Sequence, residues 1–394
     1  MADIAVPALD DSKDSWLVYA DALQNAGDPR GELIMLSADE SRSADRAAYL
    51  DSNAEAIFGS LAGHRGKLDI EWTYCVPKTL TLKIGPEDSA KELIEATLRS
   101  PLGADMRTFR ILAQTPKYGR VELSEGLALL AKNLAPSCTA LELVDERAQE
   151  ARTLVSSDYD PGRNLVEFGN LNAVWAIPHL QKLHMWVADV HQVSLGKVDA
   201  PELRDFSLLG LRWAESYGGP TDASRALSEA NWPKLERLAL RLPETFTYSW
   251  PDNYGAYVPE SRYDEDNEYY YDDDEGWNEA INWSGELGAM LEGLQNTALE
   301  HLSLTSFASA RQLLDALDTH GLPKTLRSLD LSQSDITDEH AGWMADHAGL
   351  FSNLKTLDLS DTLIDSPDAL EGLAPEVVHS SGSGAIYRFN VGME

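Results

Sequence analysis

The chain has 394 residues, of which 43% are hydrophobic and 25% are charged, a composition typical of globular proteins. It carries 65 Asp and Glu residues against 32 Lys and Arg residues, so its formal net charge is −33. Because nucleic acids and anionic membrane surfaces both attract Lys and Arg, this charge argues against either as a partner.

The chain contains two cysteines, Cys75 and Cys138, which lie far apart without a CxxC or Cys/His grouping. This pattern argues against a disulfide framework or a zinc site and fits a reducing compartment. Residues 1–14 lack the basic region and apolar run of a secretion signal. Because no apolar stretch reaches the roughly 18 residues that a membrane helix needs, we expect a cytoplasmic protein.

Residues 1–65 are expected to form a helical domain. Helical spacing places four side chains on one face of a first helix, namely Trp16, Tyr19, Ala20 and Leu23. A Gly-Asp-Pro turn follows, and Asp28 is expected to cap a second helix that begins at Pro29. Residues 43–61 predict a third helix.

A short motif, LxxLxL, recurs through residues 66–394. The segments 326–332 (LRSLDLS) and 354–360 (LKTLDLS) are near copies, 28 residues apart. The central residues of nine copies lie 29, 32, 42, 23, 32, 64, 27 and 28 residues apart, and they are Leu80, Phe109, Leu141, Leu183, Phe206, Leu238, Leu302, Leu329 and Leu357. Each copy predicts a short strand whose alternate leucines enter the core.

The segments between these strands have helical spacing, as in the two sets Ala310, Leu313, Leu314, Leu317 and Ala341, Met344, Ala345, Ala348. One strand and one helix cannot bury their apolar faces alone, so neighbouring repeats must stack. The sequence therefore predicts an α/β solenoid, with parallel strands on the concave side, helices on the convex side and the N-terminal helices as a cap.

The repeats resemble leucine-rich repeats of the helix-bearing ribonuclease-inhibitor type. The pattern is followed by residues 329–339 (LDLSQSDITDE) and again by residues 357–364. The Asn of that family is replaced by Ser334 and Thr362, whose shorter hydroxyls are expected to bond the backbone less completely. Residues 16–36 resemble the bacterial repeat-companion domain, a short module found ahead of such repeats in myxobacteria and planctomycetes. We expect it to cover the first repeat's core.

The interval of 64 residues between Leu238 and Leu302 contains an insertion at residues 243–283. Between Asp252 and Glu279 it carries eleven acidic residues against one base, Arg262. Binding surfaces favour Tyr and Trp, so we interpret the insertion as a docking loop for a basic partner. Its expected contact residues are Trp250, Tyr254, Tyr257, Asp264, Asp266, Tyr269, Tyr270, Tyr271, Asp272, Asp273 and Asp274.

Two other interpretations of the insertion remain open. One alternative is a flexible acidic loop that adds solubility. A cation site is the other alternative, because Asp264, Asp266, Glu268, Asp272 and Glu275 have an EF-hand-like spacing. Tyr269, however, stands where such a loop has glycine for its sharp turn.

The outward side of the strands is a second candidate surface. Alternation places charged, hydroxyl and aromatic residues there, including Asp205, Ser207, His301, Ser303, Ser328 and Thr356. The expected contact residues on this face are Lys182, His184, Trp186, Arg237, Arg241, Asp330 and Asp358. Cations and rings precede carboxylates along the chain, so the face is suited to a partner with the opposite gradient.

No HExxH, Gly-x-Ser-x-Gly, Walker A or GxGxxG motif occurs, so we predict no catalytic residue, metal or cofactor. The sequence favours a non-enzymatic scaffold or regulator that binds a protein partner and is monomeric when unbound. One alternative is a regulated substrate or inhibitor of another bacterial protein, cleaved or bound at the insertion. The other is an enzyme subunit that depends on a divalent cation.

Overall fold

A computed structural model describes residues 6–8, 11–114, 119–150, 164–188, 193–210, 222–242, 284–307 and 310–381. The chain divides into two compact units. Unit 1 comprises Met1–Glu146 and Leu165–Met185, and unit 2 comprises Arg147–Asn164 and Trp186–Glu394. The insertion at residues 243–283 lies outside the described residues.

Unit 1 begins with helices, as expected. They are α1 (Lys13–Asn25), α2 (Arg30–Ser37), η1 (Glu40–Arg42), α3 (Ser43–Ser52), α4 (Ala54–Phe58) and η2 (Gly59–Lys67), where η denotes a 3₁₀ helix. The predicted face of α1 is buried, and Asp28 Oδ1 accepts the N–H of Arg30, the first residue of α2. The second helix therefore begins one residue later than predicted.

The third predicted helix, residues 43–61, is interrupted. It breaks at Asn53 and again at Gly59, which has a φ of 54°. A Cβ on Gly59 would lie 2.7 Å from Cδ of Pro101, so this backbone approaches the first repeat more closely than other residues allow. A contact with a residue distant in sequence thus decides where the helix ends.

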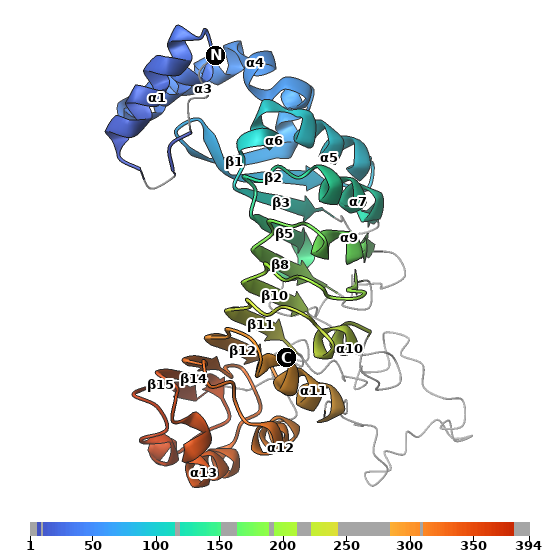
Figure 1. Cartoon of the computed structure of the whole chain (residues 1–394), viewed down its shortest axis with the longest axis vertical. Helices are drawn as coiled ribbons and strands as arrows, with labels where there is room; N and C mark the ends of the chain where they lie inside the picture. The colour runs from blue at the N-terminus through green and yellow to red at the C-terminus, as the bar shows by residue number, and fades with distance from the viewer. Residues whose placement is uncertain are drawn as a thin grey trace, which may run out of the picture. The chain divides into compact units, whose positions relative to one another are not determined.

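A sheet of five strands forms the centre of unit 1, in the order β1 (Leu68–Thr73), β2 (Val76–Ile84), β3 (Thr108–Ala113), β5 (Ala140–Asp145) and β8 (Lys182–Val187). The pair β1 and β2 is antiparallel, whereas β2, β3 and β5 are parallel and in register through Leu80, Phe109 and Leu141. Helices follow the strands and lie along one side of the sheet, as Figure 1 shows for α5 (Ala90–Arg99) and α7 (Ser124–Asn133).

Smaller elements complete this part of the chain. They are α6 (Pro101–Asp105), β4 (Gly119–Glu122), α8 (Glu146–Glu150), β6 (Asn164–Glu167), β7 (Gly169–Asn170) and α9 (Asn172–Trp175). Strands β4 and β6 pair as a separate ribbon. The parallel strands are therefore joined by connections that contain helices, as the sequence predicts.

The described part of unit 2 contributes six further strands to the main sheet, and these six pair with one another in parallel. The strands are β10 (Asp205–Gly210), β11 (Arg237–Arg241), β12 (His301–Thr305), β13 (Ser328–Asp330), β14 (Thr356–Thr362) and β15 (Glu376–Ser381), after a short β9 (Val193–Ser194). The elements between them are α10 (Asp222–Ser228), α11 (Ser284–Leu294), α12 (Ala310–His320), α13 (Asp338–Asp346), η6 (Ala348–Phe351) and η7 (Pro367–Leu370) (Figure 1).

The leucine motif explains this arrangement. All nine predicted central residues lie on strands and are at most 1% exposed. In unit 2 they form one continuous row, because Phe206, Leu238, Leu302, Leu329 and Leu357 are Cα partners across adjacent strands. The described part of the chain is thus a mixed α/β protein built on parallel strands, with one row of apolar residues shared by successive repeats.

Hydroxyl side chains satisfy backbone groups where the chain leaves the strands. The Oγ atom of Ser334 accepts the N–H of Phe307 at 3.0 Å and donates to the carbonyl of Ser332 at 3.4 Å. Thr362 donates to the carbonyl of Leu359 at 2.9 Å. Both side chains are fully buried, and they serve the backbone at the positions predicted from the sequence.

Two details of the predicted helices differ. Ala310, Leu313, Leu314 and Leu317 are buried in α12, and Ala341 and Met344 are buried in α13, as expected. Ala345, within α13, and Ala348 are instead exposed. Ala348 lies outside the helix because α13 ends at Asp346 and the backbone of His347 leaves the helical region. Within the described residues, no helix is long and apolar enough to cross a membrane.

Candidate interaction surface

The strands of unit 2 present their alternate side chains away from the core. We call this surface the strand face; it comprises Asp205, Leu209, Arg237, Ala239, Arg241, His301, Ser303, Thr305, Ser328, Asp330, Thr356, Asp358, Ser360, Glu376, Val378 and Ser380. Register aligns these residues across neighbouring strands, so that Arg237, His301 and Ser328 are successive Cα partners. Ser207 occupies an outward position but is only 7% exposed, so it adds little to the surface.

Positive charge on the strand face is concentrated on β11. Arg237 is exposed, and it has no ion-pair partner among the described residues. Arg241, four positions along the same strand, is half-buried, and the small Ala239 lies between the two. Strand β11 therefore carries two arginines on either side of a small central residue.

Negative charge lies on β13 and β14. Asp330 and Asp358 are Cα partners, so their side chains stand side by side. One carboxylate oxygen of each, Oδ1, accepts the N–H of the residue two positions on, Ser332 or Ser360, at 2.9 Å. These bonds fix the direction of both carboxylates at the strand ends.

The second carboxylate oxygens differ. Oδ2 of Asp330 accepts a hydrogen bond from Ser303 at 2.8 Å, whereas within the described structure Oδ2 of Asp358 has no hydrogen-bond partner. Two adjacent carboxylates repel one another, and only one is neutralised in part by a neighbouring hydroxyl. A cationic group of a partner would relieve that repulsion.

An uncharged strand separates the two regions. Strand β12 places His301, Ser303 and Thr305 between β11 and β13. Because adjacent strands are about 4.8 Å apart, the guanidinium and carboxylate regions are separated by about 10 Å at the backbone. The strand face thus carries its cations on β11, with Asp205 of β10 beside Arg237, and adjacent carboxylates on β13 and β14.

Strand β8 carries the other three predicted contact residues. Lys182, His184 and Trp186 alternate with Leu183, Met185 and Val187, which are fully buried. Lys182 is exposed, and the other two are half-buried. The structure brings together Arg237, Arg241, Asp330 and Asp358 on the strand face, while the β8 residues form a separate set.

Sequence reasoning missed a charged pair in unit 1. Register aligns Thr81, Arg110 and Glu142 on the outward side of β2, β3 and β5. Arg110 Nη1 lies 3.5 Å from Glu142 Oε2, and both side chains are 23% exposed. Buried and outward residues alternate around Phe109 and Leu141, and this alternation could have predicted that Arg110 and Glu142 lie side by side on the outward side.

Both cysteines are buried and free, and burial raises the pKa of each thiol to about 12, which disfavours the nucleophilic thiolate. Both cysteines therefore belong to the core. The chain as described contains no cluster of His, Cys, Asp or Glu that could hold a metal ion. The predicted contact residues of the insertion, Trp250 to Asp274, lie outside the described residues.

The chain is similar to solved structures, two of which are described here. No family model and no curated protein sequence matches the chain. A structural genomics protein from Bacteroides fragilis aligns with 16% identity and a TM-score of 0.49, covering 76% of this chain and 75% of that chain. An internalin from Listeria monocytogenes aligns with 13% identity and a TM-score of 0.22, covering 84% of this chain and 95% of that chain. The description of the repeats rests on the strand register and burial given above.

Proposed function

We propose that the chain is a leucine-rich-repeat protein that binds a protein partner without catalysis. In this proposal the repeats form a solenoid, the helices of residues 1–65 cap its first repeat, and the strand face contacts the partner. Strand β8 and the insertion at residues 243–283 extend the contact surface. The pattern of parallel strands, buried leucines and intervening helices supports the fold.

The two-signed strand face carries the functional part of the proposal. A solvated strand face needs no particular order of charges, whereas this one has cations on β11 and adjacent carboxylates on β13 and β14. Opposed regions of charge orient an incoming partner and disfavour the reversed orientation. The matching partner has acidic groups opposite Arg237 and Arg241 and basic groups opposite Asp330 and Asp358.

The bound partner would also satisfy groups that the chain leaves open. Asp358 Oδ2 accepts nothing within the described structure, and Arg237 has no ion-pair partner there. Charge-assisted hydrogen bonds to carboxylates and guanidinium groups are among the stronger polar contacts in interfaces. A partner that supplied both would gain affinity as well as orientation.

Reversal of the strand face tests this proposal without a change in net charge. The variant combines Arg237→Glu, Arg241→Glu, Asp330→Lys and Asp358→Lys. Its matched control is Arg311→Glu with Asp315→Lys, which reverses an exposed ion pair on α12. Wild type and both variants are used as bait in a lysate of the source cells, and the captured proteins are identified by mass spectrometry.

We expect one protein to be retained by wild type and control and lost by the reversed variant. With that protein purified, reversal should weaken the affinity by about tenfold or more, since like charges would then face each other. Equal capture by all three baits would reject the strand face as the binding surface.

The insertion is tested separately with the purified partner. Neutralising Asp264, Glu265, Asp266, Asp272, Asp273, Asp274 and Glu275 to Asn or Gln should slow association and flatten its salt dependence. Stopped-flow association rates at two salt concentrations measure this. Unchanged rates would remove the insertion from the contact surface and leave the strand face untouched.

A further inference from the structure

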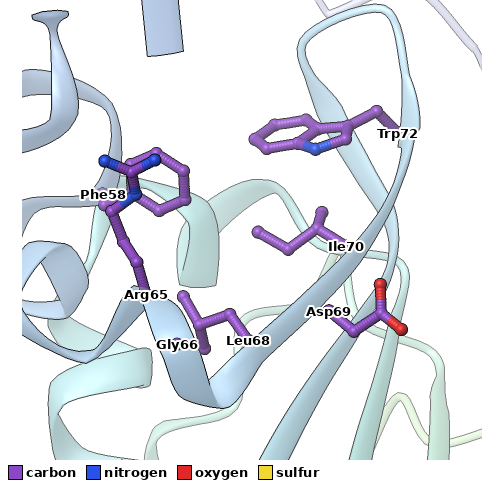
Figure 2. A pocket seen from close by; sticks show the side chains of 7 residues that line it. All are labelled: Phe58, Arg65, Gly66, Leu68, Asp69, Ile70 and Trp72. Atoms are coloured by element: carbon purple, nitrogen blue, oxygen red, sulfur yellow. The ribbon is translucent and has the colours of Figure 1, made fainter. Parts of the chain in front are cut away.

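Unit 1 contains a pocket outside the proposed binding surface. Its volume is about 400 Å³, and it lies between strand β1 and the segment formed by α4 and η2. The pocket is lined by Phe58, Arg65, Gly66, Leu68, Asp69, Ile70 and Trp72. Figure 2 shows Leu68, Ile70 and Trp72 along the strand, with Phe58 and Arg65 across from them and Asp69 turned away.

Two aromatic rings and two guanidinium groups are grouped here. Phe58 and Trp72 meet edge to face, with centroids 6.4 Å apart. Arg65 lies over the Phe58 ring at 5.2 Å, and Arg46 lies over the Trp72 ring at 5.8 Å. The stacking holds both cations beside an open pocket that is lined in part by apolar side chains.

Both guanidinium groups retain unused donors. Arg65 Nη2 donates to Asp51, which is its one hydrogen-bond partner in the described structure, and 37% of the Arg65 side chain is exposed. Nε and Nη2 of Arg46 are buried, and no described residue accepts a hydrogen bond from them. Burial lowers the pKa of Arg46, and no carboxylate opposes that shift. A buried, unpartnered guanidinium is costly unless a ligand supplies the acceptor.

The pocket also lies beside an open strand edge. Within the described residues β1 has one strand neighbour, β2, so its other edge has no paired strand. Register with β2 is regular from Leu68 to Glu71 and shifts between Glu71 and Trp72. A partner strand could therefore pair with about four residues of β1, and its alternate side chains would point toward the pocket.

We propose that β1 and this pocket bind an extended peptide segment of a partner protein. The segment pairs with the edge of β1 and places an aromatic or long aliphatic side chain between Phe58, Ile70 and Trp72. A neighbouring carboxylate of the segment accepts hydrogen bonds from the free donors of Arg65, and the Arg46 guanidinium adds to the positive field. The site is distinct from the strand face and does not depend on it.

Charge decides the class of peptide. The chain as a whole repels acidic ligands, since its net charge is −33. Near the pocket, however, Arg65 pairs with Asp51, none of the described acidic groups pairs with Arg46, and the side chain of Asp69 is turned away from the cavity. Local attraction therefore favours a carboxylate, and long-range repulsion is screened beyond about 8 Å at about 0.15 M salt.

Selection of peptides on the full-length chain tests the proposal. A phage-displayed library of random short peptides is selected on wild type at about 0.15 M salt, after depletion on the Arg65→Ala variant. The depletion step removes peptides that bind elsewhere on this acidic surface. We expect the enriched peptides to carry an acidic residue beside an aromatic or long aliphatic one.

Affinity measurements with the enriched peptide then test the contact between Arg65 and the carboxylate of the peptide. Fluorescence anisotropy of the labelled peptide should show about tenfold weaker binding to Arg65→Ala, and the same loss when the peptide's acid is replaced by its amide. The control Arg99→Ala removes an exposed arginine, ion-paired with Glu95 on α5, and should bind like wild type. Circular dichroism and melting temperature confirm that each variant is folded.

Three results would overturn the inference. No enrichment, or enrichment without acidic residues, would exclude the proposed ligand. Equal affinity for a peptide methylated on alternate backbone nitrogens would exclude pairing with β1, because methylation removes the donors of the added strand. Equally tight binding of 4-hydroxyphenylacetate would make the site a small-molecule pocket. None of these results affects the variants of the strand face.

Discussion

The helical N-terminus and the last repeats are held together by different kinds of contact. In the repeats around β12, β13 and β14, the same contact recurs at intervals of 27 and 28 residues, so that Leu302, Leu329 and Leu357 have equivalent surroundings. The N-terminal helices rely on contacts that occur once. A repeated core distributes its stability over many equivalent leucines, whereas the cap depends on a few individual residues.

Two contacts of the N-terminal helices illustrate this, one aromatic and one ionic. Trp16 is fully buried and stacks on Tyr74, with ring centroids 4.9 Å apart. Arg30 bonds Asp28 within the helical segment and Asp105 at the end of α6, each at 2.6 Å. These hydrogen bonds lower the pKa of Asp28 even though burial acts in the opposite direction. A single arginine thus ties the helical segment to the first repeat.

The largest expected effect concerns the repeated core. Leu329→Ala should lower the free energy of unfolding by about 2–5 kcal/mol, because it removes a buried side chain from a close-packed row and leaves a cavity. Leu329 is 1% exposed and lies between Leu302 and Leu357. Urea denaturation followed by circular dichroism measures the change.

The matched control is Ser328→Ala, on the outward side of the same strand. It should change stability by no more than about 0.5 kcal/mol, since it removes no buried group. Similar losses from both variants would contradict the assignment of inward and outward positions. Leu357→Ala should resemble Leu329→Ala, which tests the equivalence of the repeats.

A smaller effect is expected at the cap. Arg30→Ala should lower the free energy of unfolding by about 1–2 kcal/mol, because Asp28 and Asp105 lose their cationic partner at sites that water reaches in part. The side chains of the three residues are 24–27% exposed. Hydrogen exchange of the backbone amides of unit 1, measured at increasing temperature, reports the loss of stability in the region around Arg30.

Arg42→Ala provides the comparison for Arg30. Arg42 pairs with Asp45, and their side chains are 44% and 62% exposed. Removal of the Arg42 side chain should therefore lower the free energy of unfolding by less than about 0.5 kcal/mol. Equal effects at Arg30 and Arg42 would mean that Arg30 does not anchor the cap. The contrast between cap and repeats would then rest on Trp16 alone.

The repeats were predictable because their signal is periodic. Each leucine of the motif is supported by its equivalents one repeat away, so even weak copies such as those at Phe109 and Leu141 were placed correctly. The polar groups at the strand exits follow from the same alignment. It identifies Ser334 and Thr362 as the residues that take the place of Asn.

Features that occur once were not predictable. The break at Gly59 depends on its approach to Pro101, and no local pattern announces that contact. The same holds for the pocket, since Arg46, Phe58 and Arg65 come from separate helices and meet Trp72 only after folding. The strand face was predicted by alternation, but the low exposure of Ser207 depends on its neighbours.

The smallest effect is a pH dependence confined to one repeat. The Nδ1 atom of His340 accepts the backbone N–H of Thr337 at 3.1 Å at the start of α13, which requires this nitrogen to be unprotonated. Burial lowers the pKa of His340 from 6.5; the nearby Glu339 acts against this shift and Arg311 acts with it. The folded chain therefore binds this proton less readily than the unfolded chain.

The sign of the effect follows from that difference. Above pH 6.5 the imidazole is neutral in both states, and its contribution to stability is fully present. As the pH falls through the lowered pKa of the folded state, protonation removes the capping bond, so stability is lost on the acid side. His340→Gln keeps an acceptor at this capping position and should reduce the loss between about pH 7.5 and pH 5.5.

Urea midpoints at both pH values, measured for wild type and His340→Gln, test this expectation. Other groups titrate in the same range. The fall in the urea midpoint between the two pH values is therefore compared between wild type and His340→Gln. His320→Gln, at the exposed end of α12, controls for the loss of one histidine and should fall as far as wild type does. If His340→Gln falls equally far, the capping bond does not depend on the neutral ring. The pH dependence of the last repeats would then come from other titrating groups.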